Sequence, residues 1–213
     1  MIPNQPFRPA PQTARDKLLE AGVKLVRQQG FAATSVEQLC TEAGVTKGAF
    51  FHHFASKEAL GVALAHYWSS STGAFFAAAP FHHHDDPAAR VLGYIDLRIE
   101  LFSGPVESFS CVAGTMVQEA FLTSDAIRSA CNSSISGNAA ALESDLAAAL
   151  ARSGATGVTG ASLSRHIQAV IQGAFVLAKA EGGASAAGAA REHLVHLRRY
   201  LDFLFAGECA HAN

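Results

Sequence analysis

The sequence predicts an all-α protein, and three observations lead to this fold class. Alanine, leucine and other strong helix formers dominate the chain. Runs of β-branched residues bounded by turn residues are almost absent, whereas apolar residues recur at helical spacing between clusters of proline and glycine. Of the 213 residues, 49% are hydrophobic and 16% are charged, so the chain can bury a substantial core and global disorder is excluded. We expect about nine helices and no strand.

The first helix is predicted over residues 13–29, where apolar side chains share one face and Gly30 ends the pattern. Thr34 followed by Glu37 has the spacing of a capping box, which predicts the start of a second helix at this point.

A tight corner and a very short third helix follow. Gly44 supplies the corner because glycine adopts a positive φ without strain. Thr46 is expected to cap the third helix, on which Phe50 and Phe54 lie one turn apart and face inward. Three helices with a glycine corner between the second and the third form a helix-turn-helix unit.

The rest of the chain shows longer helical patterns. Ser56 is expected to cap a fourth helix that runs to about residue 79. Clusters such as "PFHHHDDP" and "SGPVESFS" are interpreted as loops. Between the loops, helices are predicted at about 88–102, 111–122, 125–152, 161–181 and 187–206.

Charge is distributed unevenly along the chain. Residues 1–60 hold seven Lys and Arg against five Asp and Glu, whereas the remaining residues hold nine against thirteen. A basic first part and an acidic second part indicate that a polyanion is bound by the first sixty residues.

In a helix-turn-helix unit the third helix enters the major groove of DNA with its N-terminal residues near bases and phosphates. Thr46 at that terminus can donate to a phosphate, and Lys47 reaches a phosphate or a guanine edge. His52 and His53 are expected on the outer surface of the helix. The predicted DNA-binding residues are Thr34, Ser35, Thr46, Lys47, Gly48, Phe51, His52, His53 and Lys57.

The stretch "GFAATSVEQLCTEAGVTKGAFFHHFASKEAL" resembles the DNA-binding domain of the tetracycline-repressor (TetR) family of bacterial transcription regulators. The resemblance covers about residues 13–62 and includes Gly30-Phe31, "AGVT", Gly48 and "SKEAL". One departure is Phe50-Phe51, where the family usually has Leu-Tyr, so the phosphate contact of the tyrosine hydroxyl is lost or taken over by a histidine.

The resemblance implies the remaining architecture. It implies a DNA-binding domain at 13–60 and a ligand-binding and dimerisation domain at 61–213, and the four prolines near the start predict a flexible arm at 1–12. Dimerisation is expected through the helices at about 161–181 and 187–206, whose apolar stripes could pair into a four-helix bundle. The alternative is that both stripes, Ile167 to Ala178 and Leu194 to Leu204, bury in the core of their own chain.

The implied function is that of a repressor of transcription that binds a double-stranded DNA operator and is released by an unknown small-molecule effector. Aromatic and polar residues on the predicted helices are candidates for the effector pocket: Trp68, Tyr94, Arg98, Cys111, Met116, Glu119 and Phe175.

An alternative function is that of a thiol-based sensor of electrophiles or oxidants. The segment "SCVAGTMVQEAFLTSDAIRSAC" resembles a branch of the family that responds to reactive electrophiles and small unsaturated acids. Cys111 opens a predicted helix, whose free N–H groups stabilise a thiolate. Cys131 could be a resolving partner. The competing interpretation is that Cys111 only packs the first turn.

Several classes of function are excluded or disfavoured. The sequence has no G-x-S-x-G, no H-E-x-x-H and no phosphate-binding loop, so no enzyme activity is expected. The histidines at 82–84 are adjacent in a loop and are interpreted as solvated, so we expect no metal and no cofactor.

We expect the protein in the cytoplasm and not in a membrane. No apolar run reaches the roughly 18 residues of a membrane span, and the start "MIPNQPFRPAPQ" lacks the apolar region of a secretory signal. Arg8 in the arm could enter a minor groove, although a mobile tail is favoured. The four cysteines are interpreted as free thiols.

Overall fold

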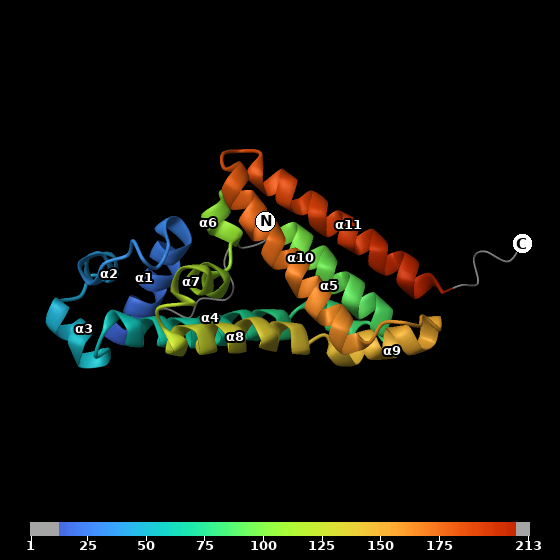
Figure 1. The fold of residues 1–213 in the computed structure, drawn as a ribbon, viewed down its shortest axis with the longest axis horizontal. Coiled ribbons are helices and arrows are strands. Elements are labelled where there is room, and N and C mark those ends of the chain that lie inside the picture. The colour runs from blue at the N-terminus through green and yellow to red at the C-terminus, as the bar shows by residue number, and fades with distance from the viewer. Residues whose placement is uncertain (1–12, 208–213) are drawn as a thin grey trace, which may run out of the picture. The chain divides into compact units, whose positions relative to one another are not determined.

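The computed structural model describes residues 13–207, and within this range the chain is helical throughout and has no strand (Figure 1). This confirms the predicted all-α class. The helices are α1 (Ala14–Gln29), α2 (Val36–Ala43), α3 (Lys47–His53), α4 (Lys57–Ala77), α5 (Pro87–Leu101), α6 (Val106–Phe109), α7 (Val112–Ala120), α8 (Asp125–Ala140), α9 (Glu143–Ser153), α10 (Gly160–Glu181) and α11 (Ala186–Ala206). The predictions for the arm at 1–12, for Arg8 and for Cys209 fall outside the described residues.

The described range contains eleven α-helices where the sequence predicted about nine, and two local features account for the difference. Residues 106–109 form the short helix α6 inside a segment predicted as a loop. The single helix predicted over 125–152 is interrupted, because α8 ends at Ala140 and α9 begins at Glu143. Neither proline nor glycine marks this break, so the sequence pattern did not reveal it.

The chain divides into two compact units. The first unit consists of Met1–Phe75 with Ser110–Ile135, and the second of Phe76–Phe109 with Ser136–Asn213. The first unit therefore joins the predicted helix-turn-helix to α7 and to the first part of α8, which lie far along the sequence. The predicted domain boundary at residue 60 stays a prediction.

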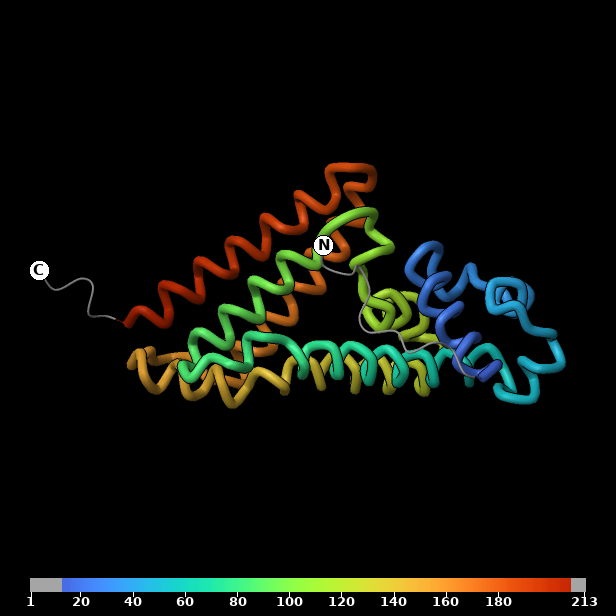
Figure 2. The backbone as a smooth tube through the Cα atoms, turned by 180° about the vertical axis from the view of Figure 1, so that it is seen from behind, coloured from blue at the N-terminus to red at the C-terminus, as the bar shows by residue number. Residues whose placement is uncertain are grey.

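In the first unit, the core is built from α1, α2, α3 and the early turns of α4. Leu18, Leu39, Phe50 and Leu64 are fully buried there. Gly22 on α1 allows close approach of α4, because a Cβ atom at this position would lie 3.2 Å from the methyl groups of Leu64. The first halves of α4 and α8 run side by side in both views (Figures 1 and 2).

In the second unit, α10 and α11 form a helical hairpin that α5 and α9 pack against (Figure 1). Phe175 on α10 stacks on Phe102 with ring centroids 5.0 Å apart, and Phe102 also stacks on Phe109.

The two predicted dimerisation stripes belong to this core. Ile167, Ile171 and Phe175 on α10 and Leu194 and Leu201 on α11 are buried within the single chain. The prediction that these stripes face a second subunit is therefore wrong for these side chains, and the alternative of burial in their own core holds. Helical periodicity identifies an apolar face but not the surface that covers it.

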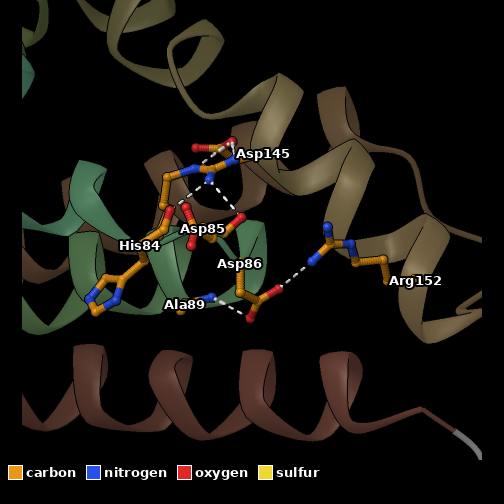
Figure 3. A network of polar contacts seen from close by, with 7 residues as sticks. His84, Asp85, Asp86, Ala89, Asp145 and Arg152 are labelled. Atoms are coloured by element: carbon orange, nitrogen blue, oxygen red, sulfur yellow. Dashed lines mark hydrogen bonds and ion pairs between the residues drawn. The ribbon is translucent and has the colours of Figure 1, made fainter.

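The segment "PFHHHDDP" was predicted as a loop, but Pro80–His83 form a short 3-10 helix and Pro87 begins α5. A polar network fixes the short loop between these two helices (Figure 3). Arg90 on α5 donates to Asp145 on α9 at 2.6 and 3.0 Å, and its Nη1 atom donates to the carbonyl oxygens of His84 and Asp85. Asp86 caps α5 by accepting the N–H of Ala89 at 3.1 Å. Arg90 thus stabilises this loop by bonding to the backbone of the loop, and the histidine side chains stay exposed.

Candidate nucleic-acid interface

Helix α2 begins one residue later than the sequence indicated. Ser35 is its N-cap, and Ser35 and Gln38 form a capping box in which each side chain accepts the backbone N–H of the other residue. The predicted box of Thr34 with Glu37 is therefore wrong. Both pairs fit the S/T-x-x-E/Q pattern, so the sequence alone does not separate them.

Thr34 also needs correction as a DNA-binding residue. Its side chain is only 1% exposed, and its hydroxyl donates to the carbonyl oxygen of Gly30 at 2.6 Å. The side chain stabilises the turn between α1 and α2 from inside, so it does not belong to the exposed surface. Ser35 is half-buried at the start of α2.

The corner between α2 and α3 has the geometry that glycine favours. Gly44 adopts φ +64°, in the left-handed region, and its N–H bonds to the end of α2. Thr46 then caps α3 by accepting the N–H of Ala49 at 3.1 Å, which confirms the predicted cap. Thr46, Lys47 and Gly48 are all exposed, so the N-terminus of α3 is open to a partner.

Two phenylalanines hold α3 on this unit. Phe50 and Phe54 are buried with ring centroids 5.8 Å apart, as predicted. Phe51 is exposed and His52 lies beside it on the surface, whereas His53 is half-buried. The inner face of α3 is therefore apolar, and its outer face presents ring nitrogens that can bond to phosphate oxygens.

Lys47 is paired with an acidic residue that the sequence did not assign to the site. Its ammonium donates to Glu37 on α2 at 2.5 Å, and both side chains are more than half exposed. The hydrogen bond from Lys47 lowers the pKa of Glu37, and the same bond raises the pKa of Lys47. Glu37 had been interpreted only as part of a cap, and its distance of ten residues from Lys47 gives no helical spacing that could have revealed the pair.

Lys57, the first residue of α4, is half-buried. Its Nζ atom donates to the carbonyl oxygen of Ala32 at 3.1 Å and lies 4.7 Å from the ring centroid of Phe31. Burial lowers the pKa of Lys57, and the nearby charge of Glu119 opposes this effect. One of its three N–H groups is thus used within the protein, which leaves two for a phosphate.

Comparison with known proteins finds a family match within the first unit. The family model described as "Bacterial regulatory proteins, tetR family" matches residues 18–64, the segment that contains α2, α3 and the corner between them. This segment of the chain is therefore similar to the tetR family of bacterial regulatory proteins.

Similar proteins are transcriptional regulators. The HTH-type transcriptional repressor NemR of Escherichia coli strain K12 is 46% identical over 55 residues, which are 25% of this chain and 28% of NemR. The transcriptional regulator AcuR of Cereibacter sphaeroides is 25% identical over 135 residues, 61% of this chain and 62% of AcuR. The crystal structure of the reduced form of E. coli NemR aligns with a TM-score of 0.70 at 25% identity and covers 86% of this chain and 96% of that one. The chain spans less than two thirds of the length of the curated relatives that it matches, from 19% upward.

The predicted effector-pocket residues are divided between the two units. Trp68, Cys111, Met116 and Glu119 belong to the first unit, and Tyr94, Arg98 and Phe175 to the second.

In the second unit, Tyr94 and Arg98 lie together. The Nε atom of Arg98 donates to the hydroxyl of Tyr94 at 2.9 Å, and the guanidinium lies 4.1 Å from the ring centroid of Phe76. Phe175 stacks in the aromatic cluster with Phe102, the residue that follows the end of α5. This face of α5 combines aromatic rings with one cation, a composition that suits a ligand with an acidic or π-electron group.

In the first unit, the candidates face different surroundings. Met116 is fully buried, and Trp68 lies under the guanidinium of Arg27 from α1, 5.4 Å from the ring centroid to the carbon of the guanidinium. Glu119 is exposed, and its carboxylate accepts the N–H of Ala32 at 2.7 Å. Trp68 and Glu119 thus contact α1 and the turn that follows it.

Cys111 is the N-cap of α7, and its Sγ atom accepts the N–H of Gly114 at 3.3 Å. The side chain is 7% exposed. Cys131 on α8 is completely buried, and burial raises the pKa of its thiol to about 12, with a smaller contribution from Cys111. Cys40, Cys111 and Cys131 are all free thiols.

Residues 13–207 contain neither a metal-binding cluster nor a membrane-spanning helix. No group of three or more His, Cys, Asp or Glu side chains there could hold a metal ion. No helix in this range combines the length and the apolar character that crossing a bilayer requires.

Proposed function

We propose that this protein is a TetR-family transcriptional repressor that binds a DNA operator as a homodimer and is released by a small-molecule effector. The observation that carries the proposal is the open N-terminus of α3, where Thr46, Lys47 and Gly48 are exposed above a buried Phe50. Such a terminus presents backbone N–H groups and a cation to the major groove.

A set of exposed side chains supports the direct contacts. Lys47 is expected to bond to a phosphate or a guanine, His52 and His53 to phosphate oxygens, and Lys57 to a phosphate with its remaining N–H groups. Phe51 offers an apolar contact where the family usually has a tyrosine, and Ser35 lies at the start of α2 near the same surface.

The dimer is expected through α10 and α11, with different side chains from those predicted. Large apolar residues are exposed on these helices: Val176, Leu177, Tyr200 and Phe203, the last of them 80% exposed. Exposed apolar surface of this kind on two adjacent helices suits a second copy of the chain. A dimer also provides the two heads that bind operator half-sites about 34–36 Å apart.

The effector is expected in the second unit near Tyr94, Arg98 and Phe175. A repressor binds chromosomal DNA, which lies in the cytoplasm of a bacterial cell, so we place the protein there. The name of NemR as a repressor supports repression, because NemR is 46% identical to this chain over 55 residues.

The DNA-binding proposal is tested by selecting a duplex from a random pool with the wild-type protein and measuring its affinity by fluorescence anisotropy. Lys47→Ala is expected to weaken binding by about 1–3 kcal/mol and to relax selectivity at one base pair. Lys24→Ala is the matched control, because Lys24 is also exposed and paired, with Glu42 at 2.6 Å, but lies outside the proposed contacts. Equal losses in both variants would contradict the assignment of α3.

The dimer proposal is tested by sedimentation. Phe203→Glu places a charge on the exposed apolar face and is expected to shift the protein toward the monomer, because an unpaired charge is costly at an apolar interface. A monomeric wild-type protein, or an unchanged dimer in the variant, would show that this face is not the interface.

The thiol sensor remains a second candidate, and one observation favours it. The Sγ atom of Cys111 already accepts a backbone N–H at the start of α7, an arrangement that would also stabilise a thiolate. If Cys111 is the sensor, iodoacetamide should release the wild-type protein from its duplex and should leave the Cys111→Ser complex intact. Equal release from both proteins would remove Cys111 from the mechanism.

A further inference from the structure

The turn between α1 and α2 is held by two charged side chains that act on one residue. The N–H of Ala32 donates to the Oε2 atom of Glu119 on α7 at 2.7 Å. The carbonyl oxygen of Ala32 accepts a hydrogen bond from Lys57 on α4 at 3.1 Å. We call Ala32, Glu119 and Lys57 the Ala32 clamp. Both polar groups of a single peptide residue are thus bonded to side chains of opposite charge from two other helices.

The backbone at the end of α1 makes room for this carboxylate. Gly30 adopts φ +89°, and a Cβ atom at this position would lie 2.2 Å from the Oε1 atom of Glu119. A contact this short is not possible, so any side chain at Gly30 would displace Glu119. The glycine therefore ends α1 and also admits the carboxylate of α7.

The next residue, Phe31, anchors the same turn in the core. Its ring lies under the ammonium of Lys57 and against Gly61 on α4, where a Cβ atom would come within 2.8 Å of the ring. The same Cβ atom would lie 3.0 Å from the side chain of Ile127 on α8. The turn is therefore a point where four helices of the first unit meet.

A short path leads from this turn to the proposed DNA surface. The hydroxyl of Thr34 bonds back to Gly30, and Ser35 caps α2. Glu37, in the first turn of α2, holds the side chain of Lys47 at the start of α3. A displacement of the turn would thus change the start of α2 and, because α2 packs against α3, the position of α3 with it.

We propose that Glu119 is a positioning residue through which α7 controls the DNA-binding helices. The proposal rests on the DNA-binding function proposed above and adds a means of regulating it. Helix α7 has nine residues, so it spans only about 13 Å. Because such a short helix moves as one body, a change at its first turn is carried to Glu119 at its last turn.

The test compares three variants of the full-length protein on the duplex selected by the wild type. Glu119→Ala removes the acceptor and is expected to weaken duplex binding about fivefold, in line with the loss of a partly exposed hydrogen bond to a charged group. Glu119→Gln keeps a carbonyl oxygen that can accept the Ala32 N–H, and should restore the wild-type affinity to within about twofold. Gln118→Ala is the control, because the side chain of Gln118 bonds only to Gly114 within α7.

A second measurement separates positioning from general stability. Hydrogen exchange of the Ala32 amide should become faster in Glu119→Ala than in Glu119→Gln, while the melting temperature of Glu119→Ala stays near that of Gln118→Ala. Wild-type duplex affinity in Glu119→Ala would overturn the inference, as would unchanged exchange of the Ala32 amide. Failure of the wild-type protein to enrich any duplex would instead remove the proposed function, and this inference with it.

Discussion

One ion pair in each unit shows two different uses of such a pair. In the first unit, Lys47 and Glu37 pair at 2.5 Å with side chains that are 57% and 64% exposed. In the second unit, Arg90 and Asp145 pair at 2.6 Å with side chains that are 25% and 21% exposed. The bond lengths are similar, but the access of water differs.

This difference in hydration separates a recognition role from a structural one. An exposed pair contributes little to folding because water screens both charges, so Lys47 can exchange its carboxylate for a phosphate at small cost. Arg90 is shielded and also holds the carbonyl oxygens of His84 and Asp85. Removing Arg90 would leave the carboxylate of Asp145 and the carbonyl oxygens of His84 and Asp85 without this hydrogen-bond donor at a site that water reaches only in part.

The largest effect is therefore expected at Arg90. Arg90→Met removes the guanidinium, leaves Asp145 half-buried without its cation, and should lower the free energy of unfolding by about 2 kcal/mol. Urea unfolding monitored by circular dichroism measures the loss. The control is Arg128→Met, because the pair of Arg128 with Asp125 is exposed and should change stability by at most about 0.5 kcal/mol. Comparable losses in both variants would contradict the distinction drawn from burial.

An intermediate effect is expected at Lys57, which is half-buried and shared between Ala32 and the proposed phosphate. Lys57→Ala should weaken specific and non-specific duplexes alike by about tenfold, and should reduce the slope of log affinity against log salt by about one. Anisotropy titrations across a salt series measure both quantities. A loss of affinity at unchanged slope would show that Lys57 acts only within the Ala32 clamp.

The smallest effect, of opposite sign, is expected at Glu37. Glu37→Gln removes a negative charge beside the proposed DNA surface and should strengthen binding to a random-sequence duplex by about threefold at low salt. Because the bond from Lys47 lowers the pKa of Glu37, this carboxylate stays charged around neutral pH, and mutation is the direct way to remove its charge. Weaker binding in Glu37→Gln would mean that the carboxylate orients Lys47 or contacts a base.

The sequence predicted the helix-turn-helix part of the first unit well, because local residue types there indicate each turn, each helix cap and each buried side chain separately. The corner at Gly44, the cap at Thr46 and the inward pair of Phe50 and Phe54 all lie where expected. The error at Thr34 arose because two overlapping residue pairs satisfy the same capping pattern. Burial decides between them, and burial depends on contacts across the turn that local spacing does not contain.

The second unit was predicted less completely for a different reason. Its longer helices were located to within a few residues, apart from the break between α8 and α9, but the short helices at Pro80–His83 and Val106–Phe109 were predicted as loops. Their apolar stripes, however, cover more than one face, and Leu194 is buried while Phe203 is exposed on the same helix. Periodicity identifies the apolar residues along a helix. Which of these residues are buried against a neighbouring helix depends on how the whole unit packs.

The composition of the first unit has a consequence for protein engineering. Ser124 and Ile127 contact Glu58 and Gly61, so segments before residue 76 and after residue 109 complete one another. A chimera that transplants only residues 13–60 onto another regulator would lose Glu119 from beneath Gly30 and would uncover the ring of Phe31. A graft that retains operator preference must carry the discontinuous segment 110–135 along with the helix-turn-helix.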